Sequence, residues 1–369
     1  MIFTEDLIRE LNLNKIDFFT GVPDSILKNF LYKLDTLNKK KHIVAANEGS
    51  AISIGLGYHL STKKIPCVYF QNSGLGNSIN PLISIAHKKV YSIPLFLLIG
   101  WRGAPGIKDE PQHNTKGKIT PKLLQNLNIK FVVLNDKSDL KKISALIKLS
   151  KKNNSIVACL VKKKTLINRE TTKKRIKKVN SDVLRSNFIE VLLNKISSNS
   201  KIISTTGYTS REIMFLRKKL KIKKGKYFYM IGGMGHSLSV SLGASLNSKN
   251  QVICLDGDGS MIMHLGSLIT ASFYGGQNLK YILLNNNIHE SVGGTTTNVE
   301  KINLKLISAG FGFRNYFMIN NIKNMKKVLN KFLKSKGPSF LEVKIKNGSL
   351  KKLPRPTDLK KIKNDFLKN

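Results

Sequence analysis

Two short polar segments, each after an apolar run, carry oxygen atoms of the kind that bind magnesium. The first, 256–260 (DGDGS), follows the run 252–255, and the second, 285–286 (NN), follows the run 281–284. Glycine lets the backbone approach a phosphate closely, and a helix that starts after Ser260 would present its positive end to that phosphate. Each segment alone is an ordinary turn. Together, at the ends of two strands, they predict a site for a diphosphate and Mg²⁺ with six oxygen ligands.

This arrangement resembles the cofactor motif of the thiamine-diphosphate enzymes, in which GDG is followed, one strand later, by NN. The resemblance implies that Asp258 and Asn286 bind Mg²⁺ through their side chains and Ile288 through its carbonyl group. It also implies cofactor contacts from the rest of the first segment, namely Gly257, Gly259 and Ser260. The cofactors that it implies are thiamine diphosphate and Mg²⁺.

A thiamine-diphosphate site also needs a carboxyl group for the aminopyrimidine ring, and Glu48 supplies one. It lies in the segment 45–51 (AANEGSA), where an apolar strand turns into a helix. A lone glutamate at this place can be explained by the favourable interaction of an acid with the start of a helix. Combined with the diphosphate motif, it indicates a carboxyl group that bonds N1′ of the ring and promotes proton transfer from the cofactor.

Two further loops complete the cofactor site that the resemblance implies. In the loop 231–236 (IGGMGH), Met234 would lie between the two rings of the cofactor, and the carbonyl group of Gly232 would accept a hydrogen bond from the amino group. Thr206, in the segment 205–207 (TTG), would donate to the diphosphate. From the residues alone, the first loop is a glycine-rich turn with a core methionine, and the second is an ordinary helix N-cap.

The elements that must hold these residues alternate between short apolar strands and amphipathic helices. We expect strands near 17–19, 43–45, 66–70, 95–99, 131–134, 156–161, 202–204, 227–230, 252–255, 281–284, 316–319 and 339–343. This rhythm is typical of an α/β fold with mostly parallel sheets covered by helices on both faces. The charged stretch 166–181 interrupts it and is the expected linker. We therefore predict two thiamine-diphosphate-binding-type domains, 1–165 for the pyrimidine ring and 182–369 for the diphosphate.

Longer stretches narrow the resemblance to one family. They are 20–25 (TGVPDS), 69–77 (YFQNSGLGN), 100–106 (GWRGAPG), 108–113 (KDEPQH) and 285–294 (NNNIHESVGG). Together they resemble the phosphonopyruvate decarboxylase family and, less closely, the related sulfopyruvate decarboxylases. The resemblance implies conversion of 3-phosphonopyruvate to phosphonoacetaldehyde and CO2 in phosphonate biosynthesis. Sulfopyruvate or another 2-oxo acid with an anionic group on C3 is the alternative substrate.

The implied reaction needs a proton donor and a pocket for a small anionic 2-oxo acid. Three side chains lie in loops that the resemblance places at the cofactor and are the proton-donor candidates: Asp24, His113 and His289. Arg102 and Lys108 are the candidates for binding the anionic groups. A surface ion pair of Arg102 with an acid at 109 or 110 is the alternative for that residue.

Four positions depart from the pattern of the family: Ala104, Lys116, Tyr208 and Gly233. None of them is an expected magnesium ligand or the ring glutamate, so we expect cofactor use to be intact. Tyr208 and Lys116 stand where they would alter contacts with the diphosphate or the substrate. An inactive cofactor-binding protein or an anion-binding module is the hypothesis from another class. The family's active sites lie between subunits, which implies a homodimer or a higher homo-oligomer.

Length and composition set outer limits. The chain has 369 residues, of which 41% are hydrophobic, and this excludes a disordered protein. It has no apolar run of about 18 residues, which argues against a membrane-spanning helix, and its first residues lack the features of a signal peptide. Three cysteines, each in an apolar run, predict reduced, buried thiols. We expect a cytoplasmic protein.

The formal net charge of +41 raises nucleic acid as a partner. Of the 63 basic residues, however, nine are arginine and 54 are lysine, and the lysines are scattered along the chain. Specific phosphate or base recognition more often uses arginine, because its planar group donates two parallel hydrogen bonds. We therefore expect no specific nucleic-acid partner.

Overall fold

The computed structural model describes residues 1–169 and 179–368. They belong to two compact units, the chain up to Arg175 and the chain from Ile176, except that the short stretch Val292–Thr295 groups with the first. Most of the expected linker, 166–181, thus lies outside the described residues. At its start, β8 (Leu166–Ile167) pairs with β1 (Ile2–Phe3).

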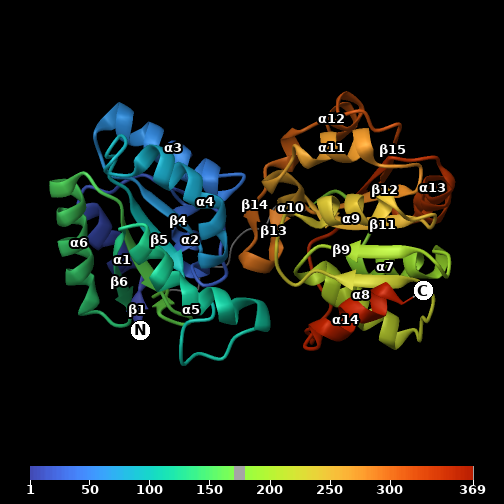
Figure 1. Cartoon of the computed structure of the whole chain (residues 1–369), viewed down its shortest axis with the longest axis horizontal. Coiled ribbons are helices and arrows are strands. Elements are labelled where there is room, and N and C mark those ends of the chain that lie inside the picture. The colour runs from blue at the N-terminus through green and yellow to red at the C-terminus, as the bar shows by residue number, and fades with distance from the viewer. Residues whose placement is uncertain (170–178, 369) are drawn as a thin grey trace. The chain divides into compact units, whose positions relative to one another are not determined.

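The first unit is built on a parallel six-stranded sheet with the strand order β3-β2-β4-β5-β7-β6 (Figure 1). Its strands are β2 (Phe19–Gly21), β3 (His42–Val44), β4 (Cys67–Gln71), β5 (Phe96–Gly100), β6 (Lys130–Leu134) and β7 (Val157–Val161). Its helices are α1 (Thr4–Leu13), α2 (Lys28–Leu34), α3 (Glu48–Thr62), α4 (Leu75–Pro81), α5 (Pro111–Asn126) and α6 (Asp139–Asn153), with the short helical turns η1 (Asn72–Gly74) and η2 (Leu82–Ala86).

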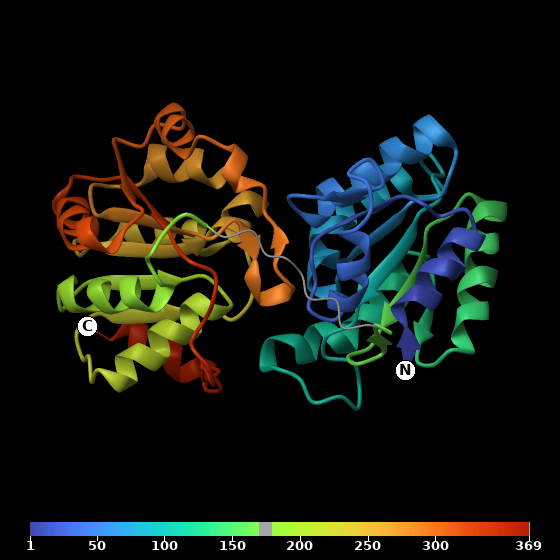
Figure 2. The same cartoon turned by 180° about the vertical axis from the view of Figure 1, so that it is seen from behind.

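Successive residues of each strand point to opposite faces of this sheet, and both faces are apolar. Cys67 and Tyr69 of β4 pack in one core with α1, α2 and α6, whereas Val68 and Phe70 pack in another with α3, α4 and α5. Figures 1 and 2 show the two layers of helices from opposite sides. A strand that is buried on both faces has a continuous apolar sequence, which is why these strands were recognisable.

The second unit repeats this architecture, with the strand order β10-β9-β11-β12-β16-β15. Its main strands are β9 (Lys201–Ser204), β10 (Lys226–Tyr229), β11 (Val252–Gly257), β12 (Leu279–Asn285), β15 (Asn315–Ile319) and β16 (Ser339–Lys344). Its helices are α7 (Arg185–Lys195), α8 (Tyr208–Lys219), α9 (Ser237–Leu246), α10 (Asp258–Met263), α11 (Ser267–Tyr274), α12 (Leu304–Gly310), α13 (Ile322–Lys334) and α14 (Leu359–Leu367). The short strands β13 (Ile288–His289) and β14 (Thr295–Thr296) pair with each other, and the turns η3 (Glu290–Val292) and η4 (Val299–Lys301) lie nearby in the chain.

Numbered within each unit, the strands of both sheets have the same spatial order, 2-1-3-4-6-5. The second strand lies on one side of the first strand and the third strand lies on its other side, so the order of the strands reverses between the first and the third. These two strands are β2 and β4 in one unit and β9 and β11 in the other. In open parallel sheets, ligands bind at the carboxyl ends of the strands beside such a point. The predicted α/β fold is confirmed, and the bounds of all twelve expected strands agree within two residues. No helix in the described ranges is long and apolar enough to cross a membrane.

Candidate active site

Glu48 is the first residue of α3 and lies at the carboxyl edge of the first sheet. The preceding Asn47 caps the helix by accepting a hydrogen bond from the backbone of Ser50 at 2.9 Å. The Glu48 side chain is buried, with 5% exposed, and its Oε2 accepts a hydrogen bond from Nδ2 of Asn77 in α4 at 2.9 Å. A Cβ on Gly74 would overlap the same carboxyl group, so a larger residue there would displace the Glu48 side chain. The carboxylate is therefore held in one orientation.

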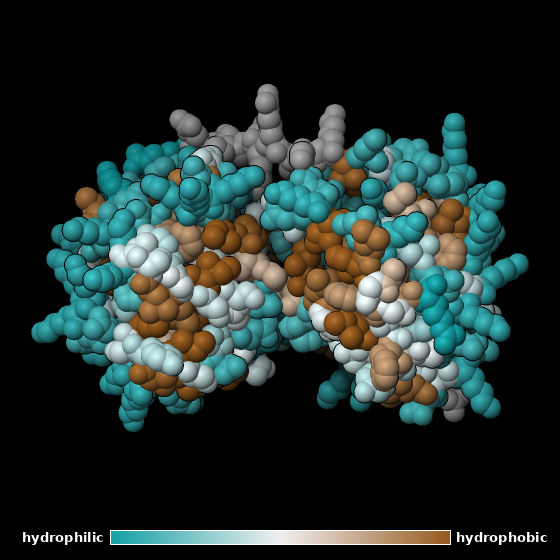
Figure 3. Space-filling view, turned by 90° about the horizontal axis from the view of Figure 1, so that it is seen from above, coloured by the Kyte–Doolittle hydropathy of each residue, from teal (hydrophilic) through white to brown (hydrophobic). Residues whose placement is uncertain are grey.

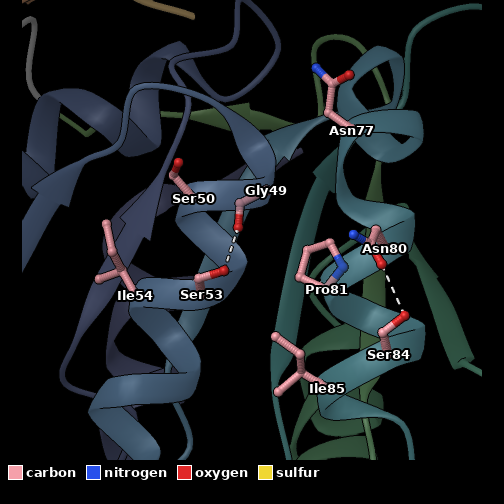
Figure 4. Close-up of a pocket in the computed structure, with 9 residues that line it drawn as sticks. All are labelled: Gly49, Ser50, Ser53, Ile54, Asn77, Asn80, Pro81, Ser84 and Ile85. Carbon is pink, nitrogen blue, oxygen red and sulfur yellow. Dashed lines mark hydrogen bonds between the residues drawn. The ribbon is translucent and has the colours of Figure 1, made fainter. Parts of the chain in front are cut away.

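A groove lies beside Glu48, between α3 and the helical stretch formed by α4 and η2 (Figure 4). It is lined by small and polar residues from both: Gly49, Ser50, Ser53, Ile54, Asn77, Asn80, Pro81, Ser84 and Ile85. The hydroxyl groups of Ser53 and Ser84 bond within their own helical stretches, to the carbonyl oxygen of Gly49 and to Oδ1 of Asn80. Asn77 lines the groove and also bonds Glu48, so the groove reaches the residue that orients the glutamate.

Asp24 follows β2 and is fully buried. It accepts hydrogen bonds from Nε2 of Gln71 at 2.5 Å and from the backbone of Ile26 and Leu27 at 3.1 and 3.2 Å. Gln71 ends β4, so this contact joins the loops on the two sides of the crossover point. Burial raises the pKa of the Asp24 carboxyl, which therefore retains a proton to higher pH than an ordinary aspartate.

Arg102 follows β5 and forms the expected ion pair with Asp109, but this pair is largely buried and does not lie on the surface. Its Nε and Nη2 atoms lie 2.7 and 2.5 Å from the two oxygens of Asp109. Its Nη1 donates to the hydroxyl group of Ser25 at 3.3 Å, so the guanidinium group lies next to the loop of Asp24. Lys108, the second candidate for binding substrate, is exposed.

His113 lies in the first turn of α5. Burial lowers the pKa of this side chain to about 4, and the positive charges of Arg102 and Lys116 add to the effect. Its Nδ1 atom is buried and has no hydrogen-bond partner among the described residues. At neutral pH the side chain is therefore an uncharged imidazole with one nitrogen available.

Asp258 begins α10 in the second unit, directly after β11. Its side chain is 3% exposed and accepts a hydrogen bond from the hydroxyl group of Thr297 at 2.7 Å. Burial raises the pKa of Asp258 to about 7. A buried carboxylate of this kind gains from a nearby cation, because the cation offsets the cost of removing the charge from water. The environment of Asp258 thus fits a metal ligand.

Ser260 joins the loops that follow β9, β10 and β11. Its hydroxyl group accepts hydrogen bonds from the hydroxyl group of Thr205 at 3.1 Å and from the backbone of Gly235 at 2.9 Å. The predicted contact Thr206 follows Thr205 in the first loop, and Gly232 and Met234 belong to the second. These predicted diphosphate and ring contacts therefore lie around the start of α10.

Gly259 shows how closely the loops approach one another. A Cβ placed on this residue would lie 2.6 Å from Nδ1 of His289 and 3.3 Å from Cε of Met234. Only glycine fits without displacing these side chains. His289 is thus next to the segment 256–260. The other two proton-donor candidates, Asp24 and His113, belong to the first unit.

Asn286 and Ile288 follow β12, and Gly257 pairs with Leu284 in the adjacent strand, so the loops of Asp258 and Asn286 leave neighbouring strands at the same edge. Asn286 is buried, and its Oδ1 accepts from the backbone of Ile288 at 3.3 Å. The described residues contain no cluster of three or more His, Cys, Asp or Glu side chains that could hold a metal ion. The expected ligands are therefore one carboxylate, from Asp258, with the amide oxygen of Asn286 and the carbonyl oxygen of Ile288. Such a set of oxygen atoms fits Mg²⁺.

Several residues of the site were not recognised from the sequence. Asn77 and Gln71 lie in the stretch 69–77, which resembles the family as a whole but does not single out either residue. Thr297 bonds Asp258 from 39 positions away, and no pattern in the chain indicates it. Asn285, half of the NN motif, bonds Glu342 of β16 at 2.9 Å, so its side chain is occupied within the sheet.

The fold and the site define a class, the thiamine pyrophosphate (thiamine diphosphate) enzymes. Residues 1–126 match the family "Thiamine pyrophosphate enzyme, N-terminal TPP binding domain", and residues 213–343 match "Thiamine pyrophosphate enzyme, C-terminal TPP binding domain". Within this class, the chain belongs to the phosphonopyruvate decarboxylase family. It is 30% identical to the phosphonopyruvate decarboxylase of Streptomyces viridochromogenes, over 96% of this chain and 91% of that protein.

More distant relatives carry a related name. The chain is 25% identical to the sulfopyruvate decarboxylase of Methanosarcina acetivorans, over 94% of this chain and 92% of that protein. It is 33% identical to the sulfopyruvate decarboxylase subunit beta of Methanothermobacter thermautotrophicus, over 40% of this chain and 75% of that subunit. The chain is therefore a thiamine-diphosphate-dependent decarboxylase, and the predicted enzyme class and organic cofactor are confirmed.

Proposed function

We propose that the chain converts 3-phosphonopyruvate to phosphonoacetaldehyde and CO2, with thiamine diphosphate and Mg²⁺. The observation that carries the proposal is the pair of buried carboxyl groups that begin helices after parallel strands, Glu48 in α3 and Asp258 in α10. The similarity to proteins named phosphonopyruvate decarboxylase, over nearly the whole chain, supports the choice of substrate. The implied role is in phosphonate biosynthesis.

The residues of the second unit would hold the cofactor. Asp258, Asn286 and the carbonyl group of Ile288 would bind Mg²⁺. The diphosphate would be bound by the start of α10 and its neighbours, namely Gly257, Gly259, Ser260 and Thr206. Met234 would support the rings from the adjacent loop, and the carbonyl group of Gly232 would accept from the amino group.

The residues of the first unit would move protons. Thiamine diphosphate supplies a nucleophilic carbon and an electron sink when it is bound. Glu48 would hydrogen-bond N1′ of its ring, and Asn77 keeps the carboxylate in place for this contact. A carboxylate that is fixed before the reaction loses no orientational freedom when the proton moves.

For the final protonation we propose His289 ahead of the other two candidates. It lies against Gly259 and therefore next to the proposed cofactor contacts. The Asp24 carboxyl group is occupied by hydrogen bonds within its own unit. His113 is uncharged at neutral pH, so we propose that it accepts a hydrogen bond from substrate or water.

We propose that Arg102 attracts the anionic substrate through its charge and that Lys108 contacts it directly. Asp109 already occupies Nε and Nη2 of the Arg102 fork, and Ser25 occupies Nη1. A guanidinium group paired in this way can orient a loop, but few of its N–H groups remain to donate hydrogen bonds to a second anion. Lys108 is exposed and belongs to the same loop.

Release of CO2 and aldehyde from phosphonopyruvate, sulfopyruvate and pyruvate tests the proposal, with thiamine diphosphate and Mg²⁺ each present or omitted. We expect cofactor-dependent turnover with the highest kcat/KM on phosphonopyruvate, because specificity is the ratio of these constants. A higher value on sulfopyruvate would favour the alternative, which the similarity to the Methanosarcina acetivorans enzyme supports. Absence of turnover on all three would favour an inactive cofactor-binding protein.

We further propose a homodimer, or a higher homo-oligomer, with active sites between subunits. Glu48 and Asp258 belong to different compact units, so a site that uses both must be assembled from two units. Large apolar side chains are exposed on α11, with 78% of Phe273 and 64% of Tyr274 accessible, and apolar patches are visible on the surface in Figure 3. Such side chains are typical of a protein interface, and we assign them to a second copy of the chain.

A reducing compartment, the cytoplasm, is the proposed location. The three cysteines, Cys67, Cys159 and Cys254, are free and buried. Burial raises the pKa of each thiol, so they are unreactive and contribute to the core. We propose no specific nucleic-acid partner, because lysine makes up most of the positive charge.

A further inference from the structure

A buried arginine lies behind the expected magnesium ligand Asn286. Arg185, the first residue of α7, is 5% exposed. Its Nη2 atom donates to Oε2 of Glu290, which begins η3, and its Nη1 atom lies 3.4 Å from Oε1 of Glu212 in α8. The other oxygen of Glu290 accepts from the backbone of Gly348. Both oxygens of Glu290 are thus occupied, and the carboxylate is fixed between α7 and the chain that follows β16.

Glu290 also contacts Asn286 directly. Nδ2 of Asn286 donates to Oε2 of Glu290 at 3.2 Å, the same oxygen that Arg185 contacts. Because Oε2 of Glu290 accepts this hydrogen bond, it selects the amide nitrogen and not the amide oxygen of Asn286. The oxygen of Asn286 must then point away from Glu290, and it lies 3.3 Å from the backbone nitrogen of Ile288. Without such a neighbour, the two ends of an asparagine amide are nearly equivalent in shape.

We infer that Glu290, held by Arg185, is a positioning residue that fixes the Asn286 amide with its oxygen toward Mg²⁺. The inference rests on the proposed magnesium site. Because a magnesium ion binds the amide oxygen and not the nitrogen, an amide that rotates freely is in the wrong orientation for part of the time. Arg185 holds Glu290 in place, since its guanidinium group donates to Oε2 of Glu290 from a buried position.

The neighbouring asparagine provides a matched control. Nδ2 of Asn285 donates to Oε1 of Glu342 at 2.9 Å, and both residues are buried. This is the same amide-to-carboxylate contact one position earlier in the chain, but Asn285 is not an expected magnesium ligand. Replacing Glu342 by glutamine therefore tests whether loss of any buried carboxylate beside the NN motif weakens magnesium binding.

The experiment measures the Mg²⁺ dissociation constant of the full chain by calorimetry in saturating thiamine diphosphate, together with the melting temperature of the cofactor-free chain. We expect Glu290→Gln to raise the dissociation constant about 10- to 100-fold, the usual effect of losing a residue that orients a metal ligand. Saturating Mg²⁺ should restore most of kcat. Arg185→Lys should raise the constant less, because lysine keeps the charge but not the fork. Glu342→Gln should leave it unchanged.

Two results would overturn the inference. One is a wild-type Mg²⁺ dissociation constant in both Glu290→Gln and Arg185→Lys, and if the glutamine variant fails to fold, the lysine variant decides alone. The other is an equal loss of affinity in Glu342→Gln, which would mean a general effect of the packing. The variant Asp258→Asn shows whether a negative result concerns the positioning role of Glu290 or the proposed magnesium site itself. If Asp258→Asn retains Mg²⁺ affinity, the site itself is wrong; if it loses affinity while Glu290→Gln does not, only the positioning role is wrong.

Discussion

Two buried carboxyl groups carry the proposed chemistry, and their surroundings differ in a way that matches their roles. Glu48 accepts a hydrogen bond from the amide of Asn77, which fixes its direction. Asp258 accepts a hydrogen bond from the hydroxyl group of Thr297, and burial raises its pKa to about 7. A bound cation would therefore stabilise its charged form. Each environment favours one task, proton transfer for the first and metal binding for the second.

Glu48→Gln tests the proton-transfer role. Glutamine keeps the size and the hydrogen-bonding reach of the side chain but cannot share a proton with a ring nitrogen. We expect kcat to fall about 10²- to 10⁴-fold, the usual contribution of a positioned acid or base. Calorimetry should show that binding of thiamine diphosphate with Mg²⁺ is retained. Full turnover in this variant would exclude the proposed mechanism.

His113 gives a prediction for pH. Its pKa is lowered from 6.5 to about 4 in the folded chain, mainly by burial. Between these values the unfolded chain binds more protons than the folded chain, so the contribution of this residue to stability is fully present above pH 6.5 and is lost as the pH falls toward 4. We expect the melting temperature of His113→Gln to fall less steeply over this range than that of the wild type. An NMR titration of His113 with a midpoint near 6.5 would contradict the prediction.

The proposed site residues were predictable where a polar side chain directly follows an apolar strand. Asp258, Asn286 and Glu48 stand out because a polar side chain directly after an apolar strand must lie at the edge of the sheet. The residues that orient them were not, because contacts such as that of Arg185 with Glu290 join positions 105 apart and leave no periodic trace in the chain. Each proposed site residue is thus marked by the strand that precedes it, whereas contacts such as this one come from distant parts of the chain.

At the scale of elements, the packing of η1 against the start of α3 decides where Glu48 points. Gly74 has φ −85° and ψ −5°, a conformation that alanine also adopts, so only the lack of space restricts this position. The sequence alone does not distinguish this glycine from Gly76, two residues later in α4. The structure does, because an added Cβ at Gly76 meets no atom of the described residues within 4 Å.

Gly74→Ala and Gly76→Ala form a matched pair. We expect the first to displace the Glu48 carboxylate and lower kcat about 10²-fold, since a misplacement of this size costs about that much. We expect the second to leave kcat unchanged and to stabilise α4 by up to about 1 kcal/mol, because alanine favours a helix more than glycine does. Steady-state kinetics and thermal melts of both variants check this, and equal kcat values would refute it.

The strands of the two large sheets were predictable because they are apolar on both faces, but the shorter strands were not. β8 has only two residues and follows the charged run 162–164, so its sequence gives no strand signal. It is a strand because β1, at the other end of the unit, provides hydrogen-bonding partners from more than 160 positions away. Pairing over such a distance is set by the tertiary fold and overrides local preference.

At the scale of the whole molecule, mixing two inactive variants tests whether sites form between subunits. Glu48→Gln carries a defective first unit and Asp258→Asn a defective second unit. If each site takes its two units from different chains, half of the dimers in an equilibrated mixture are mixed, and one of their two sites is intact. We expect about a quarter of wild-type activity after subunit exchange. No recovery, with exchange shown by mass spectrometry, would place both residues in one chain's site.

The identical strand order of the two sheets has a consequence for the origin of the chain. Glu48 and Met234 both follow the second strand of their sheets, and Arg102 and Asn286 both follow the fourth. Tandem duplication of one ancestral ligand-binding unit would leave such a correspondence. The proposed ring activation and the proposed metal binding would then be two specialisations of one ancestral set of loops.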